Sequence, residues 1–397
     1  MSISICIVTA TRAEYNLLKP LIRIISEDEN FDLYLVVTGA HLSATFGYTY
    51  KEIEEDGFSI DKKIDILMDS DSAASVSKTM GMTMISFSDY FAERNMDAIV
   101  LLGDRYETLA VACAAMNARI PIVHLYGGET TEGAIDEGIR HAITKLSYLH
   151  MTSTNEYRKR VIQLGEDPSR VFNVGALGVE NVLHTNLLSK DELEKELKVI
   201  ALKEGFGDMV NLSKPYGVVT FHPVTLEENT AEHQVEELLS VLVSHSEMEF
   251  IITKSNADAG GRRINSLLDA YGMKYKNLHV FTSLGLIRYL SAINYCAMVI
   301  GNSSSGIIEA PSFGVPTVNI GDRQKGRIRA DSIIDCNPNS KSIDAAMKKA
   351  LSKDFCKVAK NCNSPFGDGN TSKRIVEEIK RIFTSSSVDL KKKFYDL

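Results

Sequence analysis

Short apolar runs alternate with longer amphipathic stretches along almost the whole chain. This alternation is typical of strands and helices that follow one another in a parallel α/β sheet. The strands predicted in the first half are Ile3–Val8, Phe31–Val37, Ala98–Leu102, Ile120–His124, Leu149–Thr152 and Val171–Val174. The helices predicted between them are Val76–Arg94, Glu107–Ala118, Glu137–Ser147 and Asn155–Leu164. Runs such as AIVLL carry no polar face, as expected of strands covered by helices on both sides.

A polar, helix-prone stretch at Ser189–Pro215 interrupts this pattern and predicts a surface element near a domain junction. The strands predicted after it are Tyr216–Phe221, Glu249–Ile252, Leu278–Phe281, Ala297–Ile300 and Thr317–Ile320. The helices predicted with them are Ala231–Ser244, Gly260–Tyr271, Leu284–Ile293, Gly306–Phe313 and, last, Ser372–Phe383. We therefore expect an α/β protein with two Rossmann-like domains that face each other across a cleft. The expected domains are residues 1–178 and 179–372, with a C-terminal helix, 373–397, packed back on the first.

Composition narrows the class of protein. Hydrophobic residues make up 44% and charged residues 24% of the 397 positions, which is ordinary globular usage and excludes wholesale disorder. A net charge of -8 disfavours binding to nucleic acid or to a membrane surface. No apolar run approaches the roughly 18 residues of a membrane span, and no secretory signal is visible. The six scattered cysteines predict reduced, mostly buried thiols in a cytoplasmic protein.

Polar and charged residues follow most of the predicted strands. In open parallel sheets, ligands bind beyond the carboxyl ends of the strands, so these residues are candidates for a site. The candidates for acid–base chemistry are Asp104, Glu129, Asp136, Glu137 and His222. Asp104 has an alternative interpretation, in which it caps the helix that begins near Arg105.

The candidates for binding an anion are a Gly/Ser-rich run and three arginines that follow predicted strands. The Gly/Ser-rich run Gly301–Gly306 predicts a loop that offers N–H groups and hydroxyls to a diphosphate, although its serines could instead only cap a helix. Glu309 could accept the two hydroxyls of a ribose or could lie in solvent. Arg12, Arg105 and Arg323 follow three different strands and together would suit a diphosphate, whereas singly each could be a surface ion pair.

Several cofactor motifs are missing from the sequence. It contains no GxxxxGK[ST] and no GxGxxG after the first strand, which disfavours nucleotide triphosphate hydrolysis and dinucleotide redox chemistry. It also contains no HExxH pattern. We expect neither a metal nor an organic cofactor.

The ordered set of motifs resembles one enzyme family. The motifs are TRAEY, VTGAHLS, LLGDRYE, GGET, DEGIRHAITKLSYLH, FHPVT, SNADAG, IGNSSSGIIE and NIGDRQKGR, and the match continues to FGDGN at Phe366–Asn370. Together they resemble the hydrolysing UDP-N-acetylglucosamine 2-epimerase family, in its bacterial sialic-acid-pathway branch. The resemblance implies a glycosyltransferase-B type fold, a UDP-sugar substrate, no cofactor and a homodimer or homotetramer.

The resemblance also implies a reaction and roles for residues. A base removes the C2 proton while UDP leaves C1, which gives 2-acetamidoglucal, and water then adds to give N-acetylmannosamine. Asp104 matches the catalytic aspartate, and His222 matches a histidine beside the diphosphate that could assist the departure of UDP. The positions that match residues holding or lining the UDP-sugar site are Arg12, Arg105, Asn256, Ser303, Ser304, Glu309 and Arg323.

One position departs from the family pattern. Many members read HxEGGE, with the first glutamate proposed as an acid/base, but this chain has Tyr126 there. A phenol with a pKa near 10 is a poor base at neutral pH. We therefore expect Glu129, or the Asp136–Glu137 pair, to supply the second acid/base group beside Asp104.

Four alternatives stay open. The same chemistry could act on UDP-N,N'-diacetylbacillosamine in legionaminic acid synthesis. A non-hydrolysing 2-epimerase, a sugar transferase and a catalytically silent nucleotide-sugar sensor could share the fold. Release of UDP without an acceptor would separate the epimerase from the transferase and from the sensor.

Overall fold

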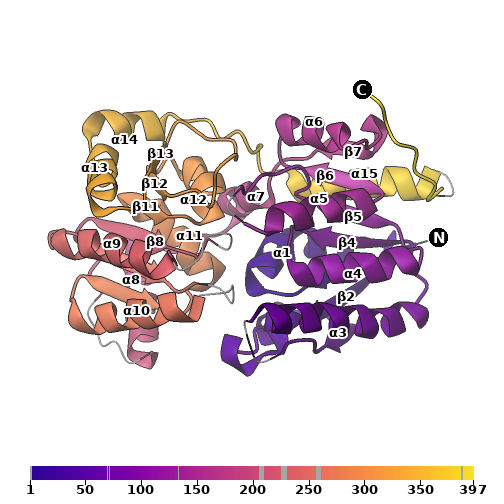
Figure 1. The fold of residues 1–397 in the computed structure, drawn as a ribbon, viewed down its shortest axis with the longest axis horizontal. Helices are drawn as coiled ribbons and strands as arrows, with labels where there is room; N and C mark the ends of the chain where they lie inside the picture. The colour runs from indigo at the N-terminus through magenta and orange to yellow at the C-terminus, as the bar shows by residue number, and fades with distance from the viewer. Residues whose placement is uncertain are drawn as a thin grey trace. The chain divides into compact units, whose positions relative to one another are not determined.

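The computed structural model describes residues 2–68, 70, 72–132, 134–204, 210–224, 230–255, 261–385 and 388–397. The chain divides into two units. Unit 1 comprises Met1–Glu129, Asp136–Asn181 and Phe366–Leu397, and unit 2 comprises Thr130–Ile135 and Val182–Pro365. Each unit contains one parallel sheet with helices on both faces, so the predicted α/β class with two Rossmann-like domains is confirmed (Figure 1).

The sheet of unit 1 has seven strands in the order β3-β2-β1-β4-β5-β6-β7. The strands are β1 (Ile3–Thr9), β2 (Phe31–Thr38), β3 (Lys62–Ile64), β4 (Ala98–Leu102), β5 (Ile122–Leu125), β6 (Leu149–Thr152) and β7 (Val171–Asn173). All of them are parallel, so their carboxyl ends share one edge of the sheet. Every residue of β4 is buried, as its uninterrupted apolar sequence predicts.

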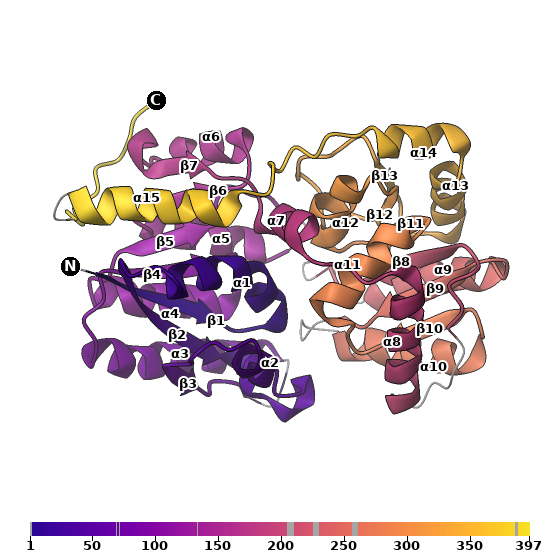
Figure 2. The same cartoon turned by 180° about the vertical axis from the view of Figure 1, so that it is seen from behind.

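Helices cover both faces of this sheet. They are α1 (Arg12–Ser26), α2 (Tyr50–Glu55), α3 (Ala73–Ala92), α4 (Tyr106–Asn117), α5 (Asp136–Leu146), α6 (Asn155–Gln163), α7 (Leu177–His184), which continues into unit 2, and α15 (Thr371–Ser385). Figure 1 looks onto α3, α4 and α5, and Figure 2 looks onto α1 and α15 on the opposite face. Alternate residues of β1 serve the two cores: Ile5 and Ile7 pack with α1 and α15, whereas Cys6 and Val8 pack with α3 and α4.

The sheet of unit 2 has six parallel strands in the order β10-β9-β8-β11-β12-β13. They are β8 (Tyr216–Thr220), β9 (Glu249–Thr253), β10 (Leu278–Phe281), β11 (Met298–Gly301), β12 (Thr317–Ile320) and β13 (Ile333–Cys336). The helices are α8 (Lys190–Lys203), α9 (Ala231–Ser244), α10 (Gly261–Lys274), α11 (Gly285–Tyr295), α12 (Ser304–Ile308), α13 (Ser340–Ala350) and α14 (Lys353–Lys360). None of the helices in the described part of the chain is both long and apolar enough to span a membrane.

The C-terminal tail and the burial of the cysteines differ from the sequence-based expectations. The C-terminal helix was expected to extend over 373–397, but residues 388–397 are not helical, and Lys392 donates to Glu166 and to two main-chain carbonyls. The cysteines were expected to be mostly buried, but only Cys6 and Cys296 are, while Cys356 is exposed. Both differences arise because contacts with distant residues, rather than local composition, decide the conformation of the tail and the exposure of each cysteine.

Candidate active site

Arg140 is the centre of a charged cluster at the carboxyl edge of the unit 1 sheet. It lies on α5 and its side chain is fully buried. Its Nη2 group forms an ion pair with Asp104, the second residue after β4, and its Nη1 group donates to Glu137 at 2.6 Å. Burial by itself would lower the pKa of Arg140, but the Asp104 and Glu129 carboxylates raise it above its usual value. Arg140 is therefore a permanent buried cation against which Asp104 is held.

Glu129 belongs to the same cluster but is more enclosed than Asp104. Its side chain is 2% exposed, and its Oε1 atom accepts a hydrogen bond from Ser153 at 2.8 Å. Its main-chain carbonyl accepts from Arg140 Nη1 at 2.9 Å. Asp136 begins α5 and is half-buried. Asp104, Glu129 and Glu137 therefore all interact with Arg140. Asp136 lies one helical turn before Arg140 on α5.

His124, on β5, is hydrogen-bonded next to two members of this cluster. Its Nε2 atom lies 2.8 Å from the carbonyl oxygen of Gly103, the residue before Asp104. Its Nδ1 atom lies 3.2 Å from Thr144 Oγ1, and that hydroxyl donates to the Arg140 carbonyl. Burial lowers the pKa of His124 to about 4, so the ring is neutral at physiological pH. His124 thus links the backbone before Asp104 to the helix that carries Arg140.

Tyr126 directly follows β5, and its backbone is unusual. Its φ is +70°, a left-handed conformation that non-glycine residues rarely adopt. Its hydroxyl oxygen accepts a hydrogen bond from the Gly178 N–H at 3.3 Å. The phenol therefore ties the β5 loop to the start of α7.

The two arginine candidates of unit 1 lie on different elements of the same sheet edge. Arg12 is the first residue of α1, whose N-cap, Thr11, forms a capping box with Glu14. Burial lowers the pKa of Arg12, and Glu52 opposes that effect. Arg105 caps α4, and its Nε atom lies 2.7 Å from Glu107 and 3.9 Å from Glu14.

In unit 2, Asn302 holds His222 in place. His222 follows β8 and is 7% exposed, with its Nδ1 atom 3.1 Å from Ser255 Oγ. The Asn302 side chain is fully buried; its Oδ1 atom accepts from the His222 N–H, and its Nδ2 atom donates to the His222 carbonyl. The main-chain carbonyl of Asn302 also accepts from Arg323 at 3.0 Å and from Gln324 at 2.9 Å. Three strand ends of unit 2, those of β8, β11 and β12, therefore meet at one asparagine.

The Gly/Ser-rich loop begins in a conformation that only glycine tolerates. Gly301 has a φ of +130°, and a Cβ placed there would lie 1.9 Å from the Thr220 carbonyl oxygen. Ser303 caps α12 by accepting from the Ser305 N–H, so a capping role is present at this loop. Ser304 opens α12 and Glu309 closes it, and both side chains are half-buried.

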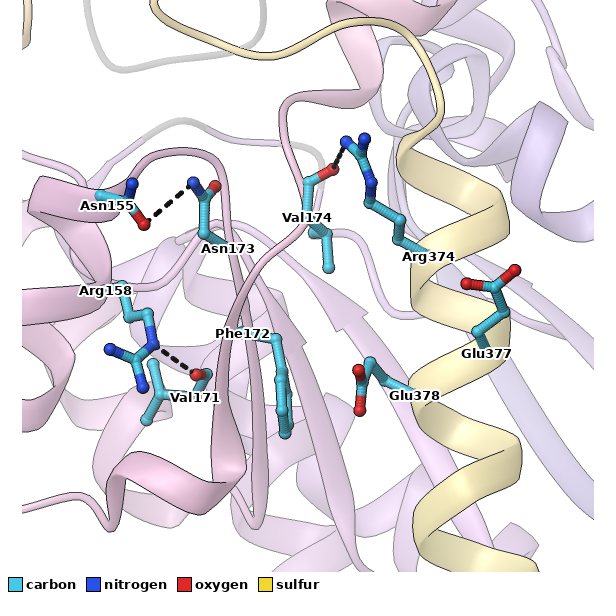
Figure 3. Close-up of a pocket in the computed structure, with 9 residues that line it drawn as sticks. All are labelled: Asn155, Arg158, Val171, Phe172, Asn173, Val174, Arg374, Glu377 and Glu378. Carbon is cyan, nitrogen blue, oxygen red and sulfur yellow. Dashed lines mark hydrogen bonds between the residues drawn. The ribbon is translucent and has the colours of Figure 1, made fainter.

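One predicted site residue cannot be placed, and the pocket of unit 1 lies away from the others. Asn256 lies outside the residues that the structure describes. A pocket in unit 1 lies between β7 and α15, and no predicted site residue lines it (Figure 3). Its arginines donate to main-chain carbonyls, Arg158 to Val171 and Arg374 to Val174. Among the described residues, no three His, Cys, Asp or Glu side chains gather as metal ligands.

No role of Arg140, Asn302 or Glu14 is predicted by the sequence pattern. Each of them lies inside a quoted motif, DEGIRHAITKLSYLH, IGNSSSGIIE and TRAEY respectively. Each acts on a residue that is distant along the chain or on another element, so spacing alone could not identify it.

A family model described as UDP-N-acetylglucosamine 2-epimerase matches residues 23–380. A Campylobacter jejuni protein named GDP/UDP-N,N'-diacetylbacillosamine 2-epimerase (hydrolyzing) is 45% identical over 88% of each chain. An Escherichia coli protein named polysialic acid biosynthesis protein P7 is 41% identical over 98% of this chain and 96% of its own. The crystal structure of a Neisseria meningitidis UDP-GlcNAc 2-epimerase bound to UDP-GlcNAc has the same fold, with a TM-score of 0.78 and 17% identity over 96% of this chain and 100% of that chain.

Proposed function

Because this chain belongs to the UDP-N-acetylglucosamine 2-epimerase family, we propose that it is a hydrolysing 2-epimerase. It converts UDP-N-acetylglucosamine and water to N-acetylmannosamine and UDP, as a step in sialic acid biosynthesis. The observation that carries the proposal is the Asp104–Arg140 ion pair at the carboxyl end of β4. The similarity to the E. coli polysialic acid protein supports the choice of pathway.

In the proposed reaction, Asp104 is the base that removes the proton from C2 of the sugar. A carboxylate in contact with a buried cation is favoured in its ionised form, as a general base requires. The electron pair of the C2–H bond forms the C1=C2 double bond, and the C1–O bond breaks so that UDP leaves with its bonding electrons. Water then adds its oxygen to C1, and a proton is delivered to C2 on the opposite face.

Of Glu129, Asp136 and Glu137, Asp136 is the best placed for the second acid/base group, since Glu137 is bonded to Arg140. Asp136 is half-buried at the first position of α5, whereas Glu129 is almost fully buried and bonded to Ser153. A proton donor to a sugar carbon must reach that carbon, which favours the more accessible carboxyl group. Glu129 then supports Arg140 through its charge and its carbonyl oxygen.

The site residues of unit 2 are proposed to bind UDP and to stabilise it as the leaving group. His222 is fixed by Asn302 and Ser255, and a hydrogen-bonding group held in advance stabilises the charge that develops on UDP. Arg323, Ser303, Ser304 and Glu309 are proposed to bind the UDP moiety, together with Arg12 and Arg105 of unit 1.

A second candidate substrate is UDP-N,N'-diacetylbacillosamine, because the C. jejuni relative at 45% identity carries that name. The two substrates share the UDP end and the 2-acetamido group and differ at C4 and C6. Incubation of the protein with each substrate in deuterated water, without an acceptor, tests both proposals. Release of UDP together with a 2-epimeric sugar labelled at C2 is expected, and the ratio of kcat/KM values identifies the substrate. If no UDP appears from either donor unless an acceptor is added, the protein is a transferase and the proposal fails.

A further inference from the structure

Arg105 lies against two glutamates where β1 and β4 end. These strands are neighbours in the sheet of unit 1, and Glu14 (on α1) and Glu107 (on α4) approach the guanidinium from the helices that follow them. Arg105 Nε is 2.7 Å from Glu107 Oε1 and 3.9 Å from Glu14 Oε1. We refer to Glu14 and Glu107 as the acid pair.

The acid pair is poorly solvated. The Glu107 side chain is 3% exposed and the Glu14 side chain 12% exposed. Glu14 Oε1 and Glu107 Oε2 are buried and have no hydrogen-bond partner in the described part of the chain. Two ionised carboxylates facing one guanidinium would leave an excess negative charge in a region of low polarity, which is costly unless a proton is bound.

The ionisation of Glu14 reflects this arrangement. Burial and then repulsion from Glu107 raise the pKa of Glu14 to about 7, against the opposing effects of Arg105 and of the Ala10 and Thr11 N–H groups. The same carboxyl group accepts from those two N–H groups through Oε2, at 2.8 Å and 3.2 Å. The proton is therefore gained or lost without breaking the cap of α1.

The other charged groups nearby leave Glu14 as the titrating group. The residues around its inner side, apart from the pair itself, are uncharged: Val8, Ala10, Thr38, Leu101, Leu102, Thr108 and Val111. His41, in the turn after β2, is neutral because burial lowers its pKa to about 4. Arg12, on the same helix as Glu14, interacts electrostatically with Glu52, and Asp104, beside Arg105, is held by Arg140.

We propose that Glu14 is a positioning residue for Arg105, and that the protonation state of Glu14 sets how strongly this guanidinium is held against the strand ends rather than offered to an anionic ligand. With Glu14 protonated, the single negative charge left on the acid pair balances Arg105. Once that proton is lost, the pair is doubly negative, binds the guanidinium more tightly and repels a diphosphate. Anion affinity therefore falls as the pH rises through about 7. The identity of the anion as the diphosphate of a UDP-sugar rests on the proposed function.

The first test needs no ligand. In the full-length protein labelled with ¹⁵N-arginine, the Nε–H resonance of Arg105, assigned with Arg105→Lys, is followed from pH 5.5 to 8.5. A titration with a midpoint near pH 7 is expected, and Glu14→Gln should abolish it. Glutamine serves at this position of a capping box, so the fold should be retained. Glu29→Gln, an exposed acid outside the pair, is the matched control and should titrate as the unchanged protein does. A resonance that does not move between pH 6 and 8, or that moves equally in Glu14→Gln, would overturn the proposal.

The second test uses UDP as the probe, in calorimetric titrations of the unchanged protein and of Glu14→Gln. The ratio of their dissociation constants should change by roughly three- to tenfold between pH 6 and pH 8.5, the size expected for one charge a few ångströms away in a partly solvated site. The ratio removes the titration of UDP itself. If UDP fails to bind at every pH, the proposed function is wrong while the first test still decides the role of Glu14. If UDP binds with a ratio independent of pH, the positioning role is wrong and the proposed function stands.

Discussion

Asn302 holds His222 by both main-chain groups of the histidine: Oδ1 accepts from the N–H at 2.7 Å, and Nδ2 donates to the carbonyl at 2.8 Å. The two residues are 80 positions apart and close a ring between the ends of β8 and β11. Asn302→Ala would leave both main-chain groups buried without these partners. The expected loss of stability is about 2–6 kcal/mol, measured by urea unfolding, since each of the two unpaired buried groups costs about 1–3 kcal/mol.

The same substitution should lower kcat more than it raises KM, because a displaced His222 affects the departure of UDP more than ground-state binding. Asn30→Ala, at an exposed turn, is the matched control and should change neither parameter. An Asn302→Ala enzyme with normal kcat would show that His222 does not need these two hydrogen bonds to act.

Asp104→Asn tests the proposed base directly. The amide keeps the shape of the side chain but cannot accept a proton, so kcat should fall by about 10²–10⁴-fold. Exchange of the C2 hydrogen with deuterated water should fall in parallel. If C2 exchange continued at the normal rate while UDP release was lost, Asp104 would not be the base.

Asp136→Asn and Glu129→Gln distinguish the two candidates for the second acid/base group. Asp136→Asn should reduce kcat by about 100-fold or more with little change in stability, because the half-buried carboxyl group is proposed to transfer a proton. Glu129→Gln should instead lower the free energy of unfolding, because it removes a buried charge that interacts with Arg140. Paired measurements of kcat and of unfolding by urea separate these outcomes, and a reversed pattern would transfer the acid/base role to Glu129.

The C-terminal tail should stabilise unit 1 through Lys392. Its Nζ group donates to the Ser147 carbonyl at 2.6 Å and lies 2.5 Å from Glu166, which also contacts Lys145 and His150. Burial by itself would raise the pKa of Glu166, but His150, Lys145 and Lys392 lower it to about 2. A carboxyl group with a lowered pKa adds stability above its usual pKa and loses it as the pH falls from about 5 to about 2.

Lys392→Met should therefore destabilise the protein at pH 7 by about 1–3 kcal/mol and flatten this acid dependence. The check is thermal unfolding at several pH values between 3 and 7. Lys391→Met, an exposed neighbour in the same tail, should leave the profile unchanged. Equal effects of the two substitutions would mean that the tail contributes to stability only through its net positive charge and not through the Lys392–Glu166 contact.

The cysteines should differ sharply in reactivity. Cys356 is exposed, whereas burial raises the pKa of Cys296 to about 12 and also raises that of Cys6. Only the thiolate is nucleophilic. Iodoacetamide at pH 8 should therefore modify Cys356 quickly, and Cys6 and Cys296 only after unfolding in urea, as mass spectrometry of digests would show. Rapid labelling of Cys6 in the folded protein would contradict its placement inside β1.

The sequence by itself determined the elements whose signal is local. The apolar runs predicted β4, β6, β10 and β12 with their observed ends, and the 3.6-residue period predicted α9, because burial on both faces or on one face leaves a direct mark on composition. It also placed the candidate acids and arginines at strand ends, since parallel connections bring those ends to one edge of a sheet.

Only the tertiary structure decided which of these residues act on one another. The Asp104–Arg140 pair spans 36 positions, and the tail reaches back from Lys392 to Glu166. Short β3 and β13 and the non-helical tail were likewise beyond local pattern, because neighbours elsewhere in the chain supply their partners. Hydrogen bonds and ion pairs require atoms to meet in space at defined angles, and a linear pattern of polar and apolar positions carries no record of those meetings.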